Sequence, residues 1–114
     1  MVVDDDTDTR DALSALLRSY SYLVFPAANA REALLAVDQH RPACVLMDIG
    51  LPDIDGYGLA RQLRALHGWD LVLIAVTGRS LRADHELAEA AGVDFVLVKP
   101  VSPDTLQRFL PPLD

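Results

Sequence analysis

Five polar residues stand directly after short apolar runs, at positions from which their side chains could act together. Asp4 and Asp5 follow "MVV", Asp48 follows "ACVLM", Thr77 follows "LVLIAV" and Lys99 follows "FVLV". Such runs are typical of buried parallel strands, and parallel strands deliver the residues at their carboxyl ends to one edge of the sheet. We therefore expect three carboxylates, one hydroxyl and one ammonium to converge at that edge.

Three carboxylates in one cleft repel one another unless a cation lies between them. Oxygen ligands of this kind suit Mg²⁺, which commonly completes its coordination with water and phosphate oxygens. The ammonium of Lys99 cannot bind a metal while it is charged, so it favours an anion in the same cleft, to which Thr77 would donate a hydrogen bond. An aspartate is ionised at neutral pH, with a reference pKa of about 3.9, and can therefore attack phosphorus directly. The pattern predicts Mg²⁺-dependent phosphoryl transfer to a carboxylate.

The elements that must position these residues alternate between strand and helix along the chain. Apolar runs predict strands, and apolar residues at helical spacing follow each of them. The predicted strands cover residues 1–4, 22–28, 43–47, 71–76 and 95–98. Five strand–helix units with short connections imply an α/β fold, a doubly wound parallel sheet covered by helices on both faces. Pro26 cannot donate a ladder hydrogen bond, so the second strand is expected at an edge of the sheet.

The ends and inner faces of the helices are also predicted from the sequence. Thr7 or Asp8 is a candidate N-cap of the first helix, Asn29 of the second and Ser80 of the fourth. Gly68 and Gly92 are placed to end the third and fourth helices. The inner faces are expected to carry Leu59, Leu63 and Leu66 on the third helix, and Leu87, Ala88 and Ala91 on the fourth. The other charges on the helices, including Arg61 and Arg64, are interpreted as solvated.

Composition and charge narrow the setting. The 114 residues, 51% of them hydrophobic, are enough for one globular domain. With 17 acidic against 10 basic residues, the formal net charge of -7 argues against direct contact with nucleic acid or a membrane surface. The single Cys44 excludes an internal disulfide and fits a buried thiol in a reducing compartment. No apolar stretch or signal segment is suited to a membrane, so we expect a cytoplasmic domain.

Four stretches resemble, in their order and spacing, the signatures of response-regulator receiver domains, the phosphoacceptors of two-component phosphorelays. They are "VVDDD", "VLMDIGLPDIDGYGL", "AVTG" and "FVLVKP", and the resemblance covers essentially the whole chain. It implies a flavodoxin-like sheet with strand order 2-1-3-4-5. The stretches "DIGLP" to "DGY" and "LVKPVSPDTL" look most like receivers fused to sensor histidine kinases. A short first strand and the closing "PPLD" then favour a single domain, residues 1–114, excised from a longer chain.

The resemblance implies a metal site and a phosphoacceptor. Asp48 resembles the acceptor aspartate, which takes its phosphoryl group from a histidine kinase or a histidine phosphotransfer protein. Asp5 looks like the direct metal ligand of the acidic pair, while Asp4 orders the metal's waters. Asp48 and the backbone carbonyl of Gly50 complete the contacts of the protein with Mg²⁺. Such a domain is not a conventional enzyme by itself, because it assists its own phosphorylation and dephosphorylation.

The resemblance also implies how the signal would be passed on. Thr77 matches the switch hydroxyl and Lys99 the phosphate-pairing lysine, with a cis peptide before Pro100. The fourth helix, fifth strand and fifth helix would form the contact face for an output domain or partner protein. Val96 stands where the family often has an aromatic residue, so a rotating ring cannot report phosphorylation from this position. A bare Gly50 would leave the acyl phosphate open to water, whereas Arg79 would shield it or pair with it, and the sequence does not decide between these two effects.

Two other classes of function compete with this interpretation. An aspartate-nucleophile phosphatase needs Asp-x-Asp-x-Thr/Val after the first strand, but the frames that start at Asp4 and Asp6 place Asp8 and Arg10 at the fifth position. An inert receiver-like interaction module generally loses the acceptor, the lysine or one of the acidic pair, whereas this chain keeps all of them. Asp6 and Asp8 are better explained as solvated, helix-capping residues. The three histidines show no metal-ligand spacing and are expected at the surface: His40, His67 and His85.

Overall fold

The computed structural model describes residues 1–78 and 82–111, and only the backbone of residues 82–84. A five-stranded parallel sheet has the order β2-β1-β3-β4-β5. The strands are β1 (Val2–Val3), β2 (Pro26–Ala27), β3 (Cys44–Asp48), β4 (Val72–Thr77) and β5 (Phe95–Val98). The expected strand order is thereby confirmed, with Pro26 in an edge strand. Arg79, Ser80 and the last three residues of "PPLD" lie outside the described residues, so their expected roles stay predictions.

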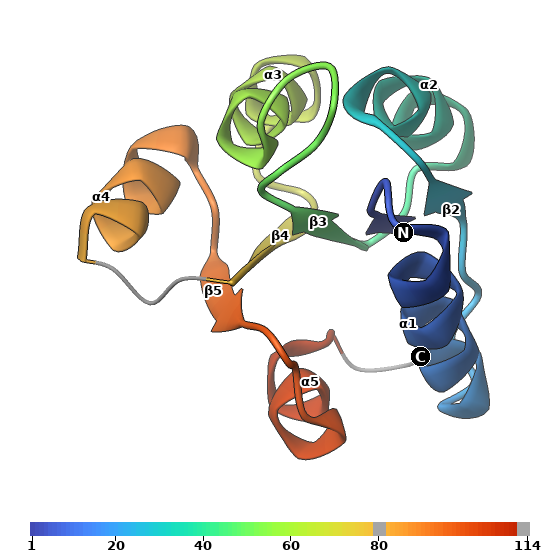
Figure 1. Cartoon of the computed structure of the whole chain (residues 1–114). Coiled ribbons are helices and arrows are strands. Elements are labelled where there is room, and N and C mark those ends of the chain that lie inside the picture. The colour runs from blue at the N-terminus through green and yellow to red at the C-terminus, as the bar shows by residue number, and fades with distance from the viewer. Residues whose placement is uncertain (79–81, 112–114) are drawn as a thin grey trace.

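Five helices cover the two faces of the sheet. They are α1 (Thr7–Ser19), α2 (Ala30–His40), α3 (Gly56–His67), α4 (Arg82–Ala91) and α5 (Pro103–Phe109). Helices α2, α3 and α4 lie on one face, and α1 and α5 lie on the other (Figure 1). The two buried clusters of apolar side chains correspond to these faces, one beneath α2 and α3, and one beneath α1 and α5. The predicted doubly wound α/β architecture is therefore the observed one.

Local sequence signals account for several helix ends. The Asn29 side chain accepts a hydrogen bond from the Glu32 backbone N–H at 2.8 Å, so the predicted N-cap of α2 is confirmed. Gly68 and Gly92 follow α3 and α4 with φ of 68° and 83°, a region that favours glycine. The N-cap position of α1 is Asp6, so the prediction of Thr7 or Asp8 was wrong by one or two residues.

The predicted inner faces are correct near the middle of the sheet and wrong at two leucines. Leu59 and Leu63 of α3 are fully buried, as expected. Leu66, in the last turn of α3, is 66% exposed, and Leu87 of α4 is 49% exposed. Among the described residues, no helix is both long enough and apolar enough to cross a bilayer.

Arg64 was predicted to be solvated, and this was wrong, because its side chain is only 9% exposed. Its Nη2 lies 2.7 Å from Oδ2 of Asp94, and the same oxygen accepts the backbone N–H of Leu73. The guanidinium also stacks on the Trp69 ring at 4.1 Å. Its other N–H groups donate to three backbone carbonyls at 2.7–3.0 Å, those of Gly68, Leu71 and Gly92. One side chain thus joins the end of α3, the end of α4, and the entries to β4 and β5.

Candidate active site

The three predicted carboxylates meet at the carboxyl edge of the sheet. β1 and β3 are neighbours in the register Val3↔Met47, which places Asp4 beside Asp48. One oxygen from each of Asp4, Asp5 and Asp48 lies within 4.8 Å of the others. Asp4 is buried, Asp48 is partly buried and Asp5 is exposed. The cluster is therefore open to solvent on one side and closed on the other.

Lys99, which follows β5, reaches the same cluster. Its Nζ lies 3.1 Å from Oδ1 of Asp48 and 3.6 Å from Oδ2 of Asp4. Burial acts to lower the pKa of Lys99, but the hydrogen bond and charge of Asp48, with the charge of Asp4, outweigh it and raise the pKa above its ordinary value. The peptide bond before Pro100 is cis, as the resemblance implied. The ammonium is thus held in its charged form against the carboxylates.

Asp4 is the carboxylate that the fold confines most. Burial raises its pKa above the ordinary value, and the charges of Asp48 and Asp5 act in the same direction. The backbone N–H of Asp6, which donates to Oδ1 of Asp4 at 2.9 Å, and the charge of Lys99 oppose this shift. A raised pKa means that the surrounding groups only partly compensate the negative charge. An added cation in this cluster would compensate it further.

The loop that follows Asp48 is fixed at both ends. A Cβ on Gly56 would lie 2.7 Å from the Asp48 carbonyl oxygen, so only glycine allows α3 to begin this close to β3. The Gly56 backbone N–H donates to the Ile49 carbonyl at 2.9 Å. Asp55 caps α3 by accepting the Gly58 backbone N–H at 2.7 Å. The sequence folds this way because Asp and Gly stand where the helix needs an N-cap and a close approach.

Asp53, for which no role was predicted, ties this loop to α2. Its carboxylate accepts the backbone N–H groups of Ala30 at 3.0 Å and Arg31 at 2.9 Å, in the first turn of α2. These hydrogen bonds lower the pKa of Asp53 below its usual value. The partners are more than twenty residues away along the chain, so no local pattern could have identified them.

The donor set fits a hard divalent cation. Three carboxylates face one ammonium, and their oxygens are close enough to share an ion. Asp6 and Asp8 lie outside this cluster and are exposed, as predicted. Asp6 occupies the N-cap position of α1, but its side chain makes no capping hydrogen bond, and Asp8 stands in the first turn.

The family model for the response regulator receiver domain matches residues 1–110. The chain belongs to this family. The receiver domain is 33% identical to a CheY-like receiver domain protein from Methanospirillum hungatei, with a TM-score of 0.87 over 94% of this chain and 85% of that one. It is 34% identical to the receiver domain of sensor histidine kinase PA1611 from Pseudomonas aeruginosa, whose structure has a magnesium ion coordinated in the active site cleft. That match has a TM-score of 0.84 and covers 94% of this chain and 88% of the other.

Among curated relatives, Response regulator Rre1 from Synechocystis is 35% identical over 112 residues, which are 96% of this chain and 48% of that protein. Several relatives named as probable transcriptional regulators are matched over less than half of their length. The chain is therefore a receiver domain of two-component signalling, and it spans about half the length of several relatives that it matches. This result argues against the phosphatase alternative.

Of the remaining predicted residues of the receiver domain, Thr77 and Gly50 lie at the same edge of the sheet and Val96 lies within β5. Thr77 ends β4, is 4% exposed, and its carbonyl accepts the Lys99 backbone N–H at 2.7 Å. Gly50 is exposed, and a Cβ at this position would lie 3.8 Å from Oδ2 of Asp48. Val96 of β5 is partly buried against the core beneath α2 and α3. All the positions that the resemblance singled out, except Arg79, thus fall within the described residues near Asp48 or on β5.

Proposed function

We propose that Asp48 accepts a phosphoryl group from a phosphohistidine of a histidine kinase or a histidine phosphotransfer protein, with Mg²⁺ in the acidic cluster. The carboxylate of Asp48 attacks phosphorus, the bond from phosphorus to the imidazole nitrogen breaks, and its electron pair returns to the ring. The product is an acyl phosphate on Asp48. The observation that carries this proposal is the 3.1 Å contact between the Lys99 ammonium and the Asp48 carboxylate inside a cluster of three aspartates.

The roles of the surrounding residues follow from their positions. Asp5, Asp48 and the Gly50 carbonyl would hold Mg²⁺ directly, and Asp4 would hold it through water. When bound, the ion neutralises charge on the transferred group. Lys99 already lies against Asp48 and is placed to pair with the phosphoryl oxygens once they arrive. Thr77, at the end of the neighbouring strand, would donate its hydroxyl to the same oxygens.

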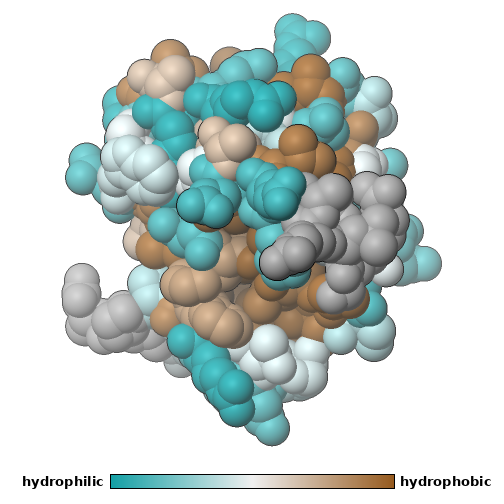
Figure 2. Space-filling model, turned by 90° about the vertical axis from the view of Figure 1, so that its left-hand side faces the viewer, coloured by the Kyte–Doolittle hydropathy of each residue, from teal (hydrophilic) through white to brown (hydrophobic). Residues whose placement is uncertain are grey.

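The surface near the site supports docking of a partner. A hollow of about 580 Å³ lies beside Lys99, between α1 and residues 99–101. It could receive the side chain that brings the phosphoryl group to Asp48. Three apolar side chains of α4 and β5 are exposed, those of Leu87, Phe95 and Val98. Figure 2 shows apolar surface on this side of the molecule. The Phe95 ring also contacts Phe109 of α5, with the ring centroids 4.7 Å apart. This α4–β5–α5 surface is our candidate for the contact with an output domain or partner protein.

We further infer that residues 1–114 form a single receiver domain within a longer cytoplasmic protein; the match of the family model over residues 1–110 supports this. Similarity to the receiver of a sensor histidine kinase supports a hybrid-kinase context, in which the unit would be the cytoplasmic part of a membrane-anchored kinase. An inert interaction module remains the competing function. The two differ in one measurable respect, which is whether Asp48 becomes phosphorylated.

The test is phosphorylation by acetyl phosphate, followed by intact-protein mass spectrometry. We expect one phosphoryl adduct in the presence of Mg²⁺ and none with EDTA. Asp48→Ala should abolish the adduct, whereas Asp8→Ala, a carboxylate on α1 outside the cluster, should leave it unchanged. An adduct that persists on the Asp48→Ala variant would refute the assignment, and the absence of any adduct on the wild-type chain would favour the inert module.

A further inference from the structure

The segment of residues 50–54, which follows Ile49 at the end of β3, has few attachments to the rest of the protein. Among the described residues, the Asp53 carboxylate makes the only hydrogen bonds that join this segment to other elements. Apolar packing adds to them, because Leu51 is 8% exposed and Ile54 packs against the core beneath α2 and α3. Asp53 is therefore the polar anchor of the segment.

The support to which Asp53 binds is itself fixed. The two carboxylate oxygens accept the backbone N–H groups of Ala30 at 3.0 Å and Arg31 at 2.9 Å. The first turn of a helix leaves such donors without partners inside the helix, and the carboxylate also lies at the positive end of the α2 dipole. The inner face of α2 is buried in the core, where Ala33 and Val37 are at most 1% exposed. α2 is thus a firm support for the loop.

Gly50 is the residue of this segment that lies closest to the acceptor carboxylate. A Cβ built at this position would lie 3.8 Å from Oδ2 of Asp48, so the Gly50 backbone runs beside that side chain. Glycine places few steric limits on its own φ and ψ, and within the described part of the chain Gly50 takes part in no hydrogen bond. The direction of its carbonyl group therefore depends on the two anchors that flank it, β3 before it and Asp53 after it.

We propose that Asp53 is a positioning residue of the magnesium site. By binding the first turn of α2, it holds residues 50–52 so that the Gly50 carbonyl can share an ion with Asp48. This role rests on the proposed function, in which the Gly50 carbonyl is one of the groups that bind Mg²⁺. Asp53 is not one of the three carboxylates of the acidic cluster, and both of its oxygens are bound to α2.

The expected effect follows from the distance along the chain. Removal of a group that hydrogen-bonds directly to a metal ligand typically lowers metal affinity about ten- to a hundredfold. Asp53 acts through the intervening backbone, so Asp53→Ala should weaken Mg²⁺ binding by less, about three- to tenfold. The Mg²⁺ concentration that gives half of the maximal phosphorylation rate with acetyl phosphate should rise by the same factor. The rate at saturating Mg²⁺ should change little, because Asp48 and Lys99 keep their contact.

Two further variants separate the position of Asp53 from its charge, since loss of a nearby negative charge also weakens the binding of a cation. Asp53→Glu keeps the charge but moves the carboxylate by one methylene group, so it should bind Mg²⁺ at least about twofold more weakly than the wild type. Asp53→Asn loses the charge but keeps one acceptor oxygen, so its affinity should lie between those of the wild type and Asp53→Ala.

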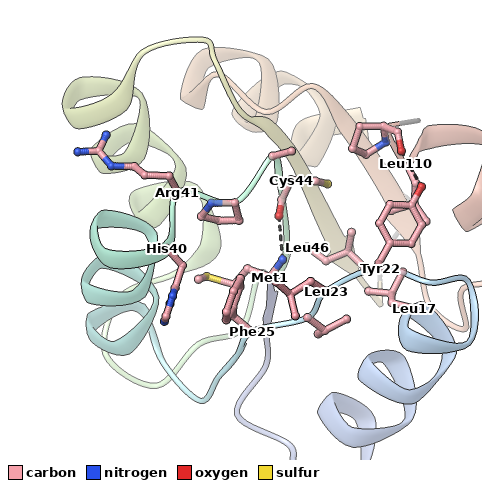
Figure 3. A pocket seen from close by; sticks show the side chains of 14 residues that line it. Met1, Leu17, Tyr22, Leu23, Phe25, His40, Arg41, Cys44, Leu46 and Leu110 are labelled. Carbon is pink, nitrogen blue, oxygen red and sulfur yellow. Dashed lines mark hydrogen bonds between the residues drawn. The ribbon is translucent and has the colours of Figure 1, made fainter. Parts of the chain in front are cut away.

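Tyr22→Phe is the control for the loss of a long-range hydrogen bond elsewhere in the fold. Tyr22 precedes β2, which contains Pro26–Ala27 and not all of the predicted residues 22–28. The Tyr22 hydroxyl donates to the Pro111 carbonyl at 2.6 Å, beside an apolar groove of about 340 Å³ at the amino end of the sheet (Figure 3). Because the acidic cluster lies at the opposite end, this variant should lose stability but keep its Mg²⁺ affinity within about twofold of the wild type.

Calorimetric titration of the 114-residue chain with Mg²⁺ measures the affinities. The amide signal of Gly50 in NMR spectra, recorded over the same titration, reports that the ion binds at the acidic cluster. Circular dichroism establishes that each variant is folded. If Asp53→Ala does not fold, Asp53→Glu and Asp53→Asn carry the same comparison with the wild type.

Two results would overturn the positioning role. One is a folded Asp53→Ala variant whose Mg²⁺ affinity stays within about twofold of the wild type. The other is an Asp53→Glu variant that binds like the wild type while Asp53→Ala and Asp53→Asn are equally weak, because the charge alone would then account for the effect. Both results leave the role of Asp48 intact when the wild type binds Mg²⁺ and takes up the phosphoryl group. A wild-type chain that binds no Mg²⁺ would instead overturn the proposed function and this role with it.

Discussion

Replacement of Arg64 by Met tests whether one buried guanidinium holds the amino end of the sheet together. The Arg64→Met variant keeps most of the apolar stem but leaves three carbonyl oxygens and the Asp94 carboxylate without their donor. Hydrogen bonds to charged groups contribute about 1.5–3 kcal/mol each, but four on one side chain are not additive. Asp94, at 30% exposure, also regains water. We therefore expect a loss of about 3–5 kcal/mol in the free energy of unfolding.

Urea and thermal unfolding, followed by circular dichroism, measure this loss. A chain of this size should show a fall of about 10–20 °C in melting temperature. Arg61→Met, an exposed arginine one turn away on the same helix, is the matched control and should change stability by less than about 0.5 kcal/mol. Arg64→Lys should recover only part of the loss, because one ammonium cannot reach all four acceptors. A loss below about 1 kcal/mol for Arg64→Met would refute the reasoning.

Three further predictions concern the site and the amino terminus. Lys99→Ala should retain Mg²⁺ binding, measured by calorimetry, since the substitution removes only a cation that faces Asp48. The variant should lose the chemical-shift changes that phosphorylation causes, and unaltered changes would count against the pairing role of Lys99. Gly56→Ala should lower the free energy of unfolding in urea by about 2–3 kcal/mol, because its Cβ would lie 2.7 Å from the Asp48 carbonyl oxygen. Gly58→Ala, whose Cβ would have 3.4 Å to its nearest neighbour, should be near neutral, and equal effects of the two variants would contradict this. The α-amino group of Met1 has a folded pKa below 8.0, so the folded state releases its proton first and stability should rise with pH up to about 8; N-terminal acetylation should abolish that rise, and its persistence would exclude this group.

The fold and the site could be predicted from the sequence where they depend on the strands and on the residues that directly follow them. Apolar runs located the strands, and a parallel sheet brings the residues that follow them together, so the cluster of Asp4, Asp5, Asp48 and Lys99 could be expected before any coordinates. These residues differ from their neighbours in type, and their partners lie on adjacent strands. A pattern of single residues was therefore sufficient.

Contacts to the backbone were not predictable in the same way. An arginine at position 64 of a helix is ordinarily expected to be solvated. Three of its acceptors are backbone carbonyl oxygens, which every residue has, so no residue type marks them in the sequence. Asp53 likewise binds backbone N–H groups of a helix that is distant in the sequence. The short β2 could not be read from its own residues either, because its length depends on how far β1 extends beside it.

The attachment of Asp53 to α2 has a mechanical consequence. The Asp53 carboxylate joins the loop between β3 and α3 to the first turn of α2. These two segments are therefore coupled, and the loop begins next to Asp48. While these hydrogen bonds persist, a displacement of that loop also moves the start of α2. The start of α2 would therefore respond to structural changes at Asp48, although position 96 carries Val and not an aromatic side chain that could rotate.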